Sequence, residues 1–210
     1  MLGIDDDSVF SAFEEQELLH PSARKMTEEK PIYLSRELQM PKAWGAPVLC
    51  DFGSAVVGDI EHREDVQPDI SRAPEVILES SWSYEIDIWN AGCMIWDLFE
   101  GGHLFTGHDP EHQTYRSRAH LAEIIALLGP LPQALLRSGA SSTKFFTDTG
   151  DFRADFPLPV TTSLEMREDS LEGDSRAKFL VMMRKMLQWE ASRRASAKAL
   201  AEDEWIKDNM

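Results

Sequence analysis

Cysteine is scarce in this sequence, and long apolar runs are missing from it. Cys50 and Cys93 are the only cysteines among 210 residues. Each lies in an apolar stretch, which predicts buried free thiols in a reducing compartment rather than a disulfide framework. No apolar run is long enough to span a bilayer, and the N-terminus lacks the basic and apolar segments of a signal peptide. These absences predict an intracellular protein, in the cytoplasm or nucleus, with no membrane partner.

Basic residues are outnumbered, with 21 Lys and Arg against 37 Asp and Glu and a formal net charge of −16. Nucleic-acid binding needs a basic face for the phosphates, so this charge argues against a nucleic-acid partner. The acidity fits a basic partner attracted by the protein's field, and it equally fits a role in solubility alone. The remaining composition, 42% hydrophobic and 28% charged, is ordinary for a globular chain able to bury a core.

Regular structure is sparse over the first 69 residues, where turn-forming and charged residues interrupt each apolar run. Pro21 stops the one helical pattern, and Gly53 ends the strongest strand candidate. The charged stretch 58–69 has no periodicity and predicts a loop. The elements expected before it are an apolar piece at 1–4, a helix over 8–19, a loop over 21–31 and strands over 32–40 and 46–51.

The helix predicted over 83–99 is the most informative element. It is apolar on nearly every side, and Gly101 and Gly102 end it. A helix without a polar face is buried within a domain or a membrane, and this one is too short to span a membrane. It therefore predicts a central core helix.

Past residue 50, apart from an irregular insertion, the sequence predicts an almost wholly helical chain. Leu121, Ile124, Ile125 and Leu128 repeat at helical spacing before Gly129-Pro130, which predicts a helix over 117–128. The elements expected beyond it are an irregular insertion at about 129–173, a helix over 174–189, and a last helix that Ser196 caps and that carries Leu200 and Trp205.

Three short motifs occur in a fixed order. Asp51-Phe52-Gly53 ends a predicted strand, Ala73-Pro74-Glu75 follows a loop, and Asp87-Ile88-Trp89-Asn90-Ala91-Gly92 opens the core helix. Pro74 lies 21 residues after Gly53. One triplet alone is weak, but this order and structural context resemble the protein kinase family over residues 46–207.

Further stretches resemble the SR-protein kinases and their fungal relatives in the CMGC group. They are residues 64–75, 120–129 and 186–197, although Glu190-Ala191 stands where the family usually has Asp-Pro. The resemblance implies a mainly α fold. It is that of a kinase C-terminal lobe, a helical bundle around a buried central helix with a few short strands near the N-terminus. Residues 1–45 would begin this lobe, and residues 46–208 would form its main part.

The resemblance implies a role for each residue of the first motif. Asp51 would hold Mg²⁺ against the phosphates of ATP, because this hard cation prefers oxygen ligands. The alternative reading is an aspartate that merely caps a strand end. Phe52 would pack between the lobes, and Gly53 would allow the turn into the loop.

The later motifs would supply the substrate loop and its support. Ser71, Arg72, Ala73, Pro74 and Glu75 match the family's substrate loop, where Ser71 and Arg72 would face the substrate. The supporting residues implied by the resemblance are Glu75 paired with Arg194, Asp87 bonded to the catalytic loop, and Trp89 packed beneath that loop. The short loop also resembles those of SR-protein kinases, which need no phosphorylation.

Several kinase parts have no counterpart in these 210 residues. There is no Gly-x-Gly-x-x-Gly and no His-Arg-Asp, and Met1–Ile4 resembles the strand that follows the catalytic loop. The resemblance therefore implies a C-lobe fragment, without the N-lobe, of a serine/threonine kinase that uses ATP and Mg²⁺. Its protein substrate would be basic or Ser/Arg-rich. The chain alone would be inactive, and the alternative is a catalytically dead lobe that acts as a protein-binding scaffold.

Overall fold

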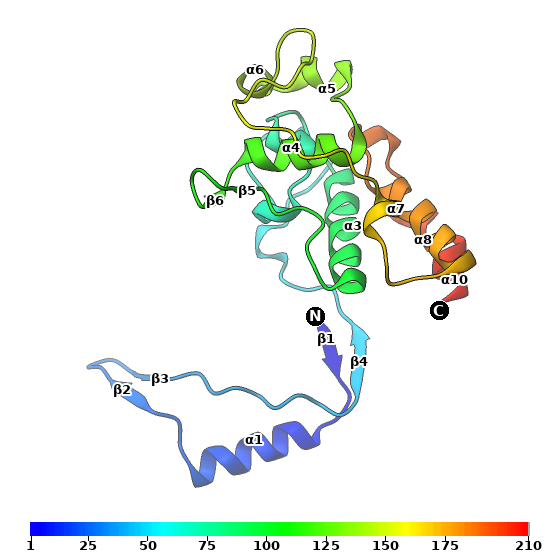
Figure 1. The fold of residues 1–210 in the computed structure, drawn as a ribbon. Coiled ribbons are helices and arrows are strands. Elements are labelled where there is room, and N and C mark those ends of the chain that lie inside the picture. The colour runs from blue at the N-terminus through cyan, green and yellow to red at the C-terminus, as the bar shows by residue number, and fades with distance from the viewer. Residues whose placement is uncertain (210) are drawn as a thin grey trace. The chain divides into compact units, whose positions relative to one another are not determined.

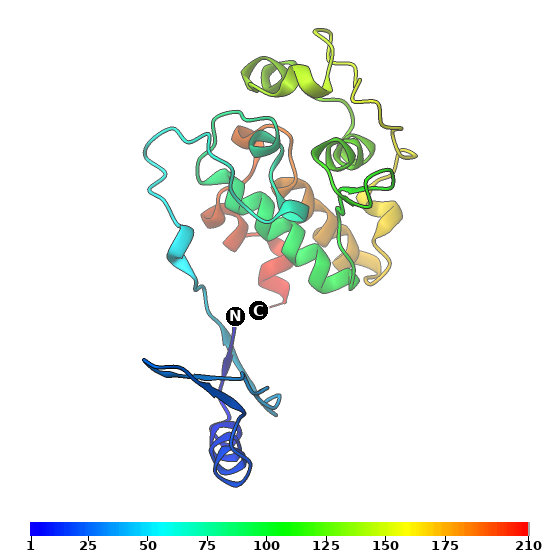
Figure 2. The ribbon, with the colours of Figure 1, turned by 90° about the vertical axis from the view of Figure 1, so that its left-hand side faces the viewer.

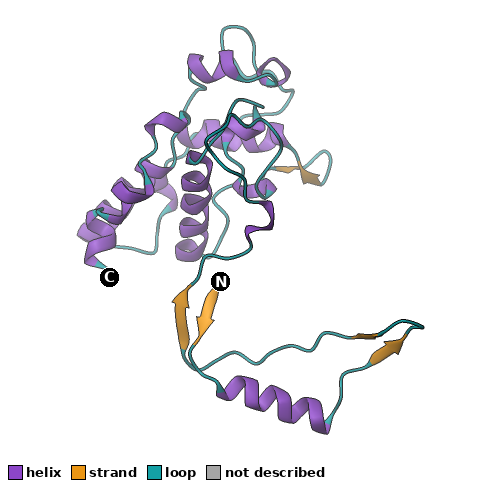
Figure 3. Cartoon of the chain, turned by 180° about the vertical axis from the view of Figure 1, so that it is seen from behind, coloured by secondary structure: helices purple, strands orange, loops and turns teal. Residues whose placement is uncertain are grey.

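The computed structural model describes residues 1–209, and it is mainly helical, as predicted. Contacts divide the chain into two compact units, residues 1–56 and the residues from Val57 onward. The predicted segments 1–45 and 46–208 follow motifs rather than contacts, and they stay a prediction. Figure 3 shows that helices are the main regular elements of the second unit, joined by long loops.

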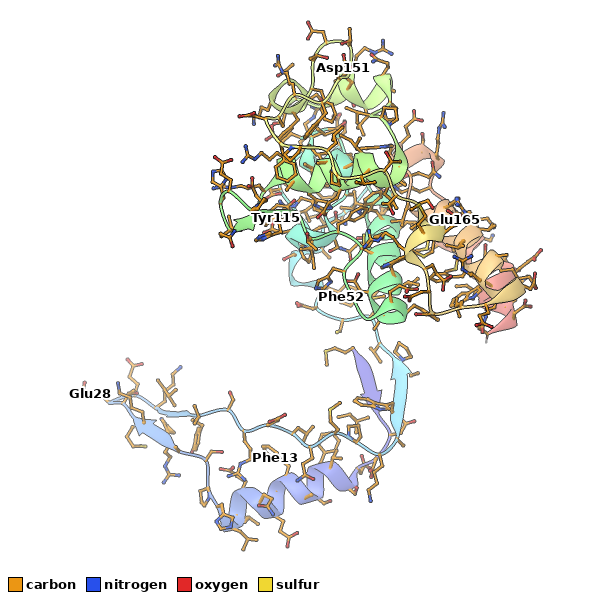
Figure 4. The ribbon with its side chains drawn as sticks, viewed as in Figure 1. Phe13, Glu28, Phe52, Tyr115, Asp151 and Glu165 are labelled. Carbon is orange, nitrogen blue, oxygen red and sulfur yellow. The ribbon has the colours of Figure 1, made fainter. Side chains whose placement is uncertain are left out.

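The first unit contains one α-helix, a short 3-10 helix and two short strand pairs, and its α-helix and strands can be followed in Figure 1. Its helix has the predicted bounds, and Phe13 on that helix faces the segment after β3 (Figure 4). The elements are β1 (Leu2–Ile4) paired antiparallel with β4 (Trp44–Pro47), α1 (Ser8–Leu19), and β2 (Arg24–Met26) paired antiparallel with β3 (Pro31–Tyr33).

The predicted strands were partly wrong in this unit. The strand over 32–40 is limited to β3, and the strand over 46–51 ends at Pro47, so Val48–Asp51 is irregular. The predicted loop over 21–31 instead contains β2, because a turn closed by Thr27 and Lys30 brings β2 and β3 together. A strand needs a partner, and local alternation does not reveal where that partner ends.

The second unit is built around α3 (Glu85–Glu100), with α4 (Ser117–Leu128) and α8 (Gly173–Met186) beside it (Figure 1). The bounds of α4 are those predicted. Aromatic rings fill the centre: Trp89 stacks on Phe105 with ring centroids 5.7 Å apart. Phe179 of α8 packs against Trp96 and against Trp205 near the C-terminus.

The composition of the central helix predicts burial on all sides, but α3 is buried on only part of its surface. Trp89 and Trp96 are buried, but Met94 is 53% exposed and Leu98 is 75% exposed. Burial depends on how many elements pack on a helix, and the helix's own composition does not count them. Gly101 ends α3 in the left-handed conformation, as predicted.

Short elements complete the second unit. The irregular insertion predicted over 129–173 contains three short helices. The sequence predicts a single last helix, but the structure has two. The Asp203 carboxylate accepts from the Trp205 backbone N–H and so starts a new helix. The elements are α2 (Pro74–Ile77), β5 (His108–Asp109) paired with β6 (Thr114–Tyr115), α5 (Gln133–Ser138), α6 (Ser142–Phe145), α7 (Leu164–Arg167), α9 (Ala197–Ala201) and α10 (Glu204–Asp208).

Both cysteines are free thiols. Cys93 is buried, and burial raises the pKa of its thiol to about 12, so it is an inert core residue. Cys50 is only half-buried, contrary to the prediction, because its strand ends before it. Within residues 1–209, no helix has both the length and the apolar character needed to cross a membrane.

Candidate functional site

Asp51 adopts a backbone conformation that is unusual for a residue other than glycine. Its φ is +66°, and it precedes a short 3-10 helix at Phe52–Ser54. Aspartate tolerates this region better than most residues, although at some cost in energy. Its carboxylate is exposed and makes no ion pair or hydrogen bond within residues 1–209. One such carboxylate fits Mg²⁺, which is usually bound through one or two carboxylates together with phosphates and water.

Phe52 and Gly53 follow Asp51 in the exposed 3-10 turn. Phe52 is 64% exposed (Figure 4), so it is not a core residue of its own unit. Asp51, Phe52 and Gly53 belong to the first unit, whereas the other predicted site residues belong to the second. The structure therefore describes two separate parts of the predicted site.

The loop before Ala73 turns at Gln67, which sequence reasoning missed. Gln67 has φ +70°, and its amide oxygen accepts from the Ala73 backbone N–H at 2.9 Å. Its amide nitrogen donates to the Ile86 carbonyl at the start of α3, at 2.8 Å. One side chain thus joins the loop before Ala73 to the central helix. A glutamine in a charged, aperiodic stretch gives no sequence signal for this role.

Arg72 is engaged by its own loop. Its guanidinium donates to the Val66 and Gln67 carbonyls and pairs with Asp65 and Asp69 at 3.3 and 3.0 Å. It also lies over the ring of Tyr115, which Figure 4 labels at the β5–β6 hairpin. These contacts leave the Arg72 side chain only 14% exposed. Direct contact between Arg72 and a substrate stays a prediction.

Ser71 ends a 3-10 helix at Asp69–Ser71 that lies against α3 (Figure 2). Its hydroxyl accepts from the Asn90 side-chain amide at 2.8 Å. Ser71 is half-buried. This contact fixes the loop immediately before Ala73, while exposure of Ser71 to a substrate stays a prediction.

Glu75 and Arg194 form a buried ion pair across 119 residues of sequence, as the resemblance implies. Two guanidinium nitrogens lie 2.6 and 2.7 Å from the two carboxylate oxygens. The Arg194 side chain is fully buried, and it also donates to the Glu85 and Gln188 carbonyls. Bidentate pairs of this kind are geometrically specific. The pair therefore ties the end of the predicted substrate loop to the start of α3 and to the C-terminal segment.

Asp87 and Trp89 lie on different sides of α3. Asp87 is exposed, and its carboxylate has no hydrogen-bond partner in the described part of the chain. Trp89 is fully buried, and the Arg194 guanidinium lies 5.1 Å from its ring. Its indole N–H has no partner among the described residues. Trp89 thus supports the buried ion pair, whereas Asp87 offers a free acceptor at the surface.

A cluster of two carboxylates and a histidine near the β5–β6 hairpin has the side-chain types of a metal site. Asp109, Glu111 and His112 bring their ligand atoms within 4.8 Å of one another. Arg118 already occupies this cluster, because its Nε lies 2.6 Å from Asp109 and its Nη2 contacts Glu111 and His112. The guanidinium holds the pKa of Asp109 well below its usual range. The cluster therefore braces the hairpin against α4.

Comparisons with known proteins agree with these motifs. The family model described as "Protein kinase domain" matches residues 41–206. A serine/threonine protein kinase of Aspergillus fumigatus is 44% identical over 205 residues, which cover 96% of this chain and 51% of that protein. The serine/threonine-protein kinase SKY1 of Saccharomyces cerevisiae is 31% identical over 84% of this chain and 24% of its own length. The dual specificity protein kinase CLK2 of Homo sapiens is 30% identical over 70% of this chain and 29% of its own length.

Proposed function

The chain belongs to the protein kinase family, and on that premise we propose that it supplies part of a protein serine/threonine kinase. That part is the C-terminal lobe, with the magnesium-binding aspartate, the substrate loop and the helical base. The chain spans about half the length of its Aspergillus relative. The proposal rests chiefly on the buried Glu75–Arg194 pair, which holds the substrate loop in a defined place.

Phosphoryl transfer depends mainly on positioning and on electrostatic stabilisation of the transferred group. Bound Mg²⁺ would supply positive charge to the nucleotide phosphates. Asp51 would contribute one oxygen ligand from its exposed carboxylate, and the positive φ at this residue would fix its direction. Gly53 would allow the chain to leave this turn, and Phe52 would use its exposed ring as a contact for another lobe.

The second unit would present the protein substrate. Gln67 and the Glu75–Arg194 pair fix the two ends of the loop from Gln67 to Glu75. Asp87 would accept hydrogen bonds from the backbone of a catalytic loop, and buried Trp89 would support it from below. These are positioning roles, since none of the residues would touch the transferred phosphoryl group.

A basic, Ser/Arg-rich protein is the substrate class that we propose. The Asp65 and Asp69 side chains remain 75% and 55% exposed beside the loop, even though both pair with Arg72. Exposed acids attract basic segments and orient their encounter. Similarity to SKY1 and to the serine/threonine-protein kinase SRPK of Physarum polycephalum supports the same class. An intracellular location belongs to this proposal, because ATP is the phosphoryl donor.

A chimera tests the proposed activity. Residues 1–210 are joined to the part of the Aspergillus relative that this chain does not cover, and phosphate incorporation into a Ser/Arg-rich peptide is measured with Mg-ATP. We expect activity that Asp51→Ala abolishes. Asp148→Ala is the matched control, because Asp148 is also an exposed loop aspartate. Equal activity in the two variants would refute the role of Asp51.

A binding scaffold is the second candidate, because the contacts that hold the loop all lie within the second unit. The docking surface thus needs no nucleotide to form. For the 210-residue chain alone, we expect neither phosphorylation of the peptide nor a shift in melting temperature with Mg-ATP. Peptide binding by fluorescence anisotropy under these conditions favours the scaffold. Phosphorylation that Asp51→Ala removes would favour the enzyme instead.

A further inference from the structure

His62 occupies a buried place in the irregular segment that leads to the substrate loop. Only 5% of the residue is exposed. Its Nδ1 lies 2.8 Å from a carboxylate oxygen of Glu64, and its Nε2 lies 2.8 Å from the Val57 carbonyl oxygen. Both ring nitrogens therefore face oxygen acceptors at hydrogen-bonding distance.

This geometry determines the protonation state of the ring. A neutral imidazole has one N–H donor, so its second nitrogen would direct a lone pair at an oxygen. The Val57 carbonyl has no proton to donate. Glu64 is ionised, because N–H groups from its own backbone and from Arg63, together with His62, lower its pKa to about 2. Both short contacts can be hydrogen bonds only if His62 is an imidazolium.

The ring connects two segments that lie side by side in the second unit. It stacks on Trp82 with centroids 4.6 Å apart and an interplanar angle of 20°. The Trp82 backbone N–H donates to the His62 carbonyl, and the Trp82 indole N–H donates to the Glu64 carbonyl, both at 3.0 Å. His62 and Glu64 thus fasten the segment 57–64 to the residues that precede α3.

The same segment continues directly into the substrate loop. Val66 and Gln67 follow Glu64, and their carbonyls accept from the Arg72 guanidinium. Many kinases order this region by phosphorylation, where a new charge pairs with basic side chains. Here an imidazolium and a carboxylate provide a charged pair without any modification.

We propose that His62 is a positioning residue of the substrate loop, whose imidazolium holds residues 57–64 on Trp82 and makes the order of this loop depend on pH. The link to a substrate rests on the proposed kinase function, but the link to loop order does not. Trp82, which packs on the ring, brings no charged atom to it. The other charged or titratable groups close by in sequence are engaged with each other and not with the His62 ring. Arg63 pairs with Glu61, and the Tyr84 hydroxyl donates to the Asp59 carboxylate.

The direction of the pH effect follows from the hydrogen bonds. The bond to the Val57 carbonyl, followed by the bond to Glu64, raises the pKa of His62 above its ordinary value of 6.5, although burial opposes this. A raised pKa means that the folded loop holds the proton more tightly than the unfolded chain does. The His62 clamp, meaning the imidazolium with its bonds to Val57 and Glu64 and its stacking on Trp82, is therefore complete below pH 6.5. It weakens as the pH rises through the raised pKa.

Two measurements on the intact 210-residue chain test this inference. The first is the ¹⁵N chemical shift of both His62 ring nitrogens between pH 5 and 9. The second is amide hydrogen exchange at Arg63 and Trp82, corrected for the intrinsic pH dependence of exchange. We expect both nitrogens to be protonated at pH 6.5. We also expect protection at Trp82 to fall at high pH, by about tenfold for each unit by which the pKa exceeds 6.5.

Variants separate the charged clamp from simple packing. His62→Phe keeps a ring against Trp82 but donates no hydrogen bond, so the pH dependence of protection should vanish. His108→Phe is the matched control, because His108 is an exposed histidine elsewhere in the second unit, and it should leave that dependence unchanged. If His62→Phe does not fold, Glu64→Gln still decides the question, since losing the carboxylate charge should lower the His62 pKa.

Two results would overturn the inference. They are a His62 pKa at or below 6.5, and Trp82 protection that is independent of pH between 6 and 9. Neither result depends on kinase activity. An active, Asp51-dependent chimera combined with either result would leave the proposed function standing and remove only the role of His62. An inactive chimera with a normal clamp would instead count against the proposed function alone.

Discussion

Replacing Glu75 with Gln should sharply destabilise the second unit. The substitution keeps the size of the side chain but removes the charge that faces Arg194. The two side chains are 3% and 0% exposed, so water cannot replace the lost carboxylate. The guanidinium would keep its bonds to the Glu85 and Gln188 carbonyls and its place over Trp89, but its charge would be unpaired.

The expected loss in the free energy of unfolding is about 3–5 kcal/mol, the usual cost of removing one partner of a buried pair. An exposed pair gives a useful contrast. Arg63 and Glu61 are 56% and 59% exposed, and surface pairs of this kind contribute about 0–1 kcal/mol. The prediction therefore rests on burial, since the closest contacts of the two pairs differ by only 0.1 Å, 2.6 Å against 2.7 Å.

Urea unfolding followed by tryptophan fluorescence measures this loss, because Trp89 lies beside Arg194. The variants are Glu75→Gln, Arg194→Met, the double variant, and Glu61→Gln as the exposed control. The double variant should be more stable than either single variant at the pair, since it leaves no unpaired buried charge. A Glu75→Gln effect no larger than that of Glu61→Gln would refute the reasoning.

Three further predictions concern residues outside this pair. His120 is buried and burial lowers its pKa to about 3, so unfolding free energy should fall by about 1.4 kcal/mol per pH unit as the pH drops below 6.5. Acid titration of His120→Phe should show a smaller slope, and an unchanged slope would contradict this. Gln67→Ala loses the side-chain hydrogen bonds to Ala73 and to Ile86 of α3 and should cost about 1–3 kcal/mol in urea unfolding. An unchanged midpoint would exclude that role. Ser196→Ala removes the N-cap on the Ala199 N–H and should cost about 1 kcal/mol in thermal unfolding, whereas Ser170→Ala, which removes no helix N-cap, should cost less.

Helices with clear stop signals were predictable from the sequence. The residues of α1 and α4 are those expected, because Pro21 and Gly129-Pro130 end apolar patterns of helical period. Strands were less predictable. β1 and β4 are only three and four residues long, and their pairing joins positions forty or more residues apart. Sequence patterns that extend over a few residues carry little information about such pairing.

The candidate site divides in the same way. The sequence pointed to Asp51 and Glu75 as candidate site residues because each lies in a short motif, and the motifs occur in the order typical of kinases. The sequence did not predict roles for Gln67 and His62, because both act through hydrogen bonds in irregular backbone. Such backbone has no apolar repeat of two or 3.6 residues. Their roles depend on a positive φ at one residue and on two acceptors placed around the other. Both are properties of the folded loop.

The structure also gives a local meaning to the net charge of −16. Several acids are already committed inside the second unit: Glu75 is paired with Arg194, Asp109 with Arg118 and Glu168 with Arg176. Because these carboxylates are buried and bonded to arginine, they cannot attract a basic partner. Asp65 and Asp69 share one arginine and remain exposed beside the predicted substrate loop. The electrostatic preference of this loop therefore depends first on the exposed acids beside it, and the total charge of the chain, which also counts the buried pairs, is a poor guide to it.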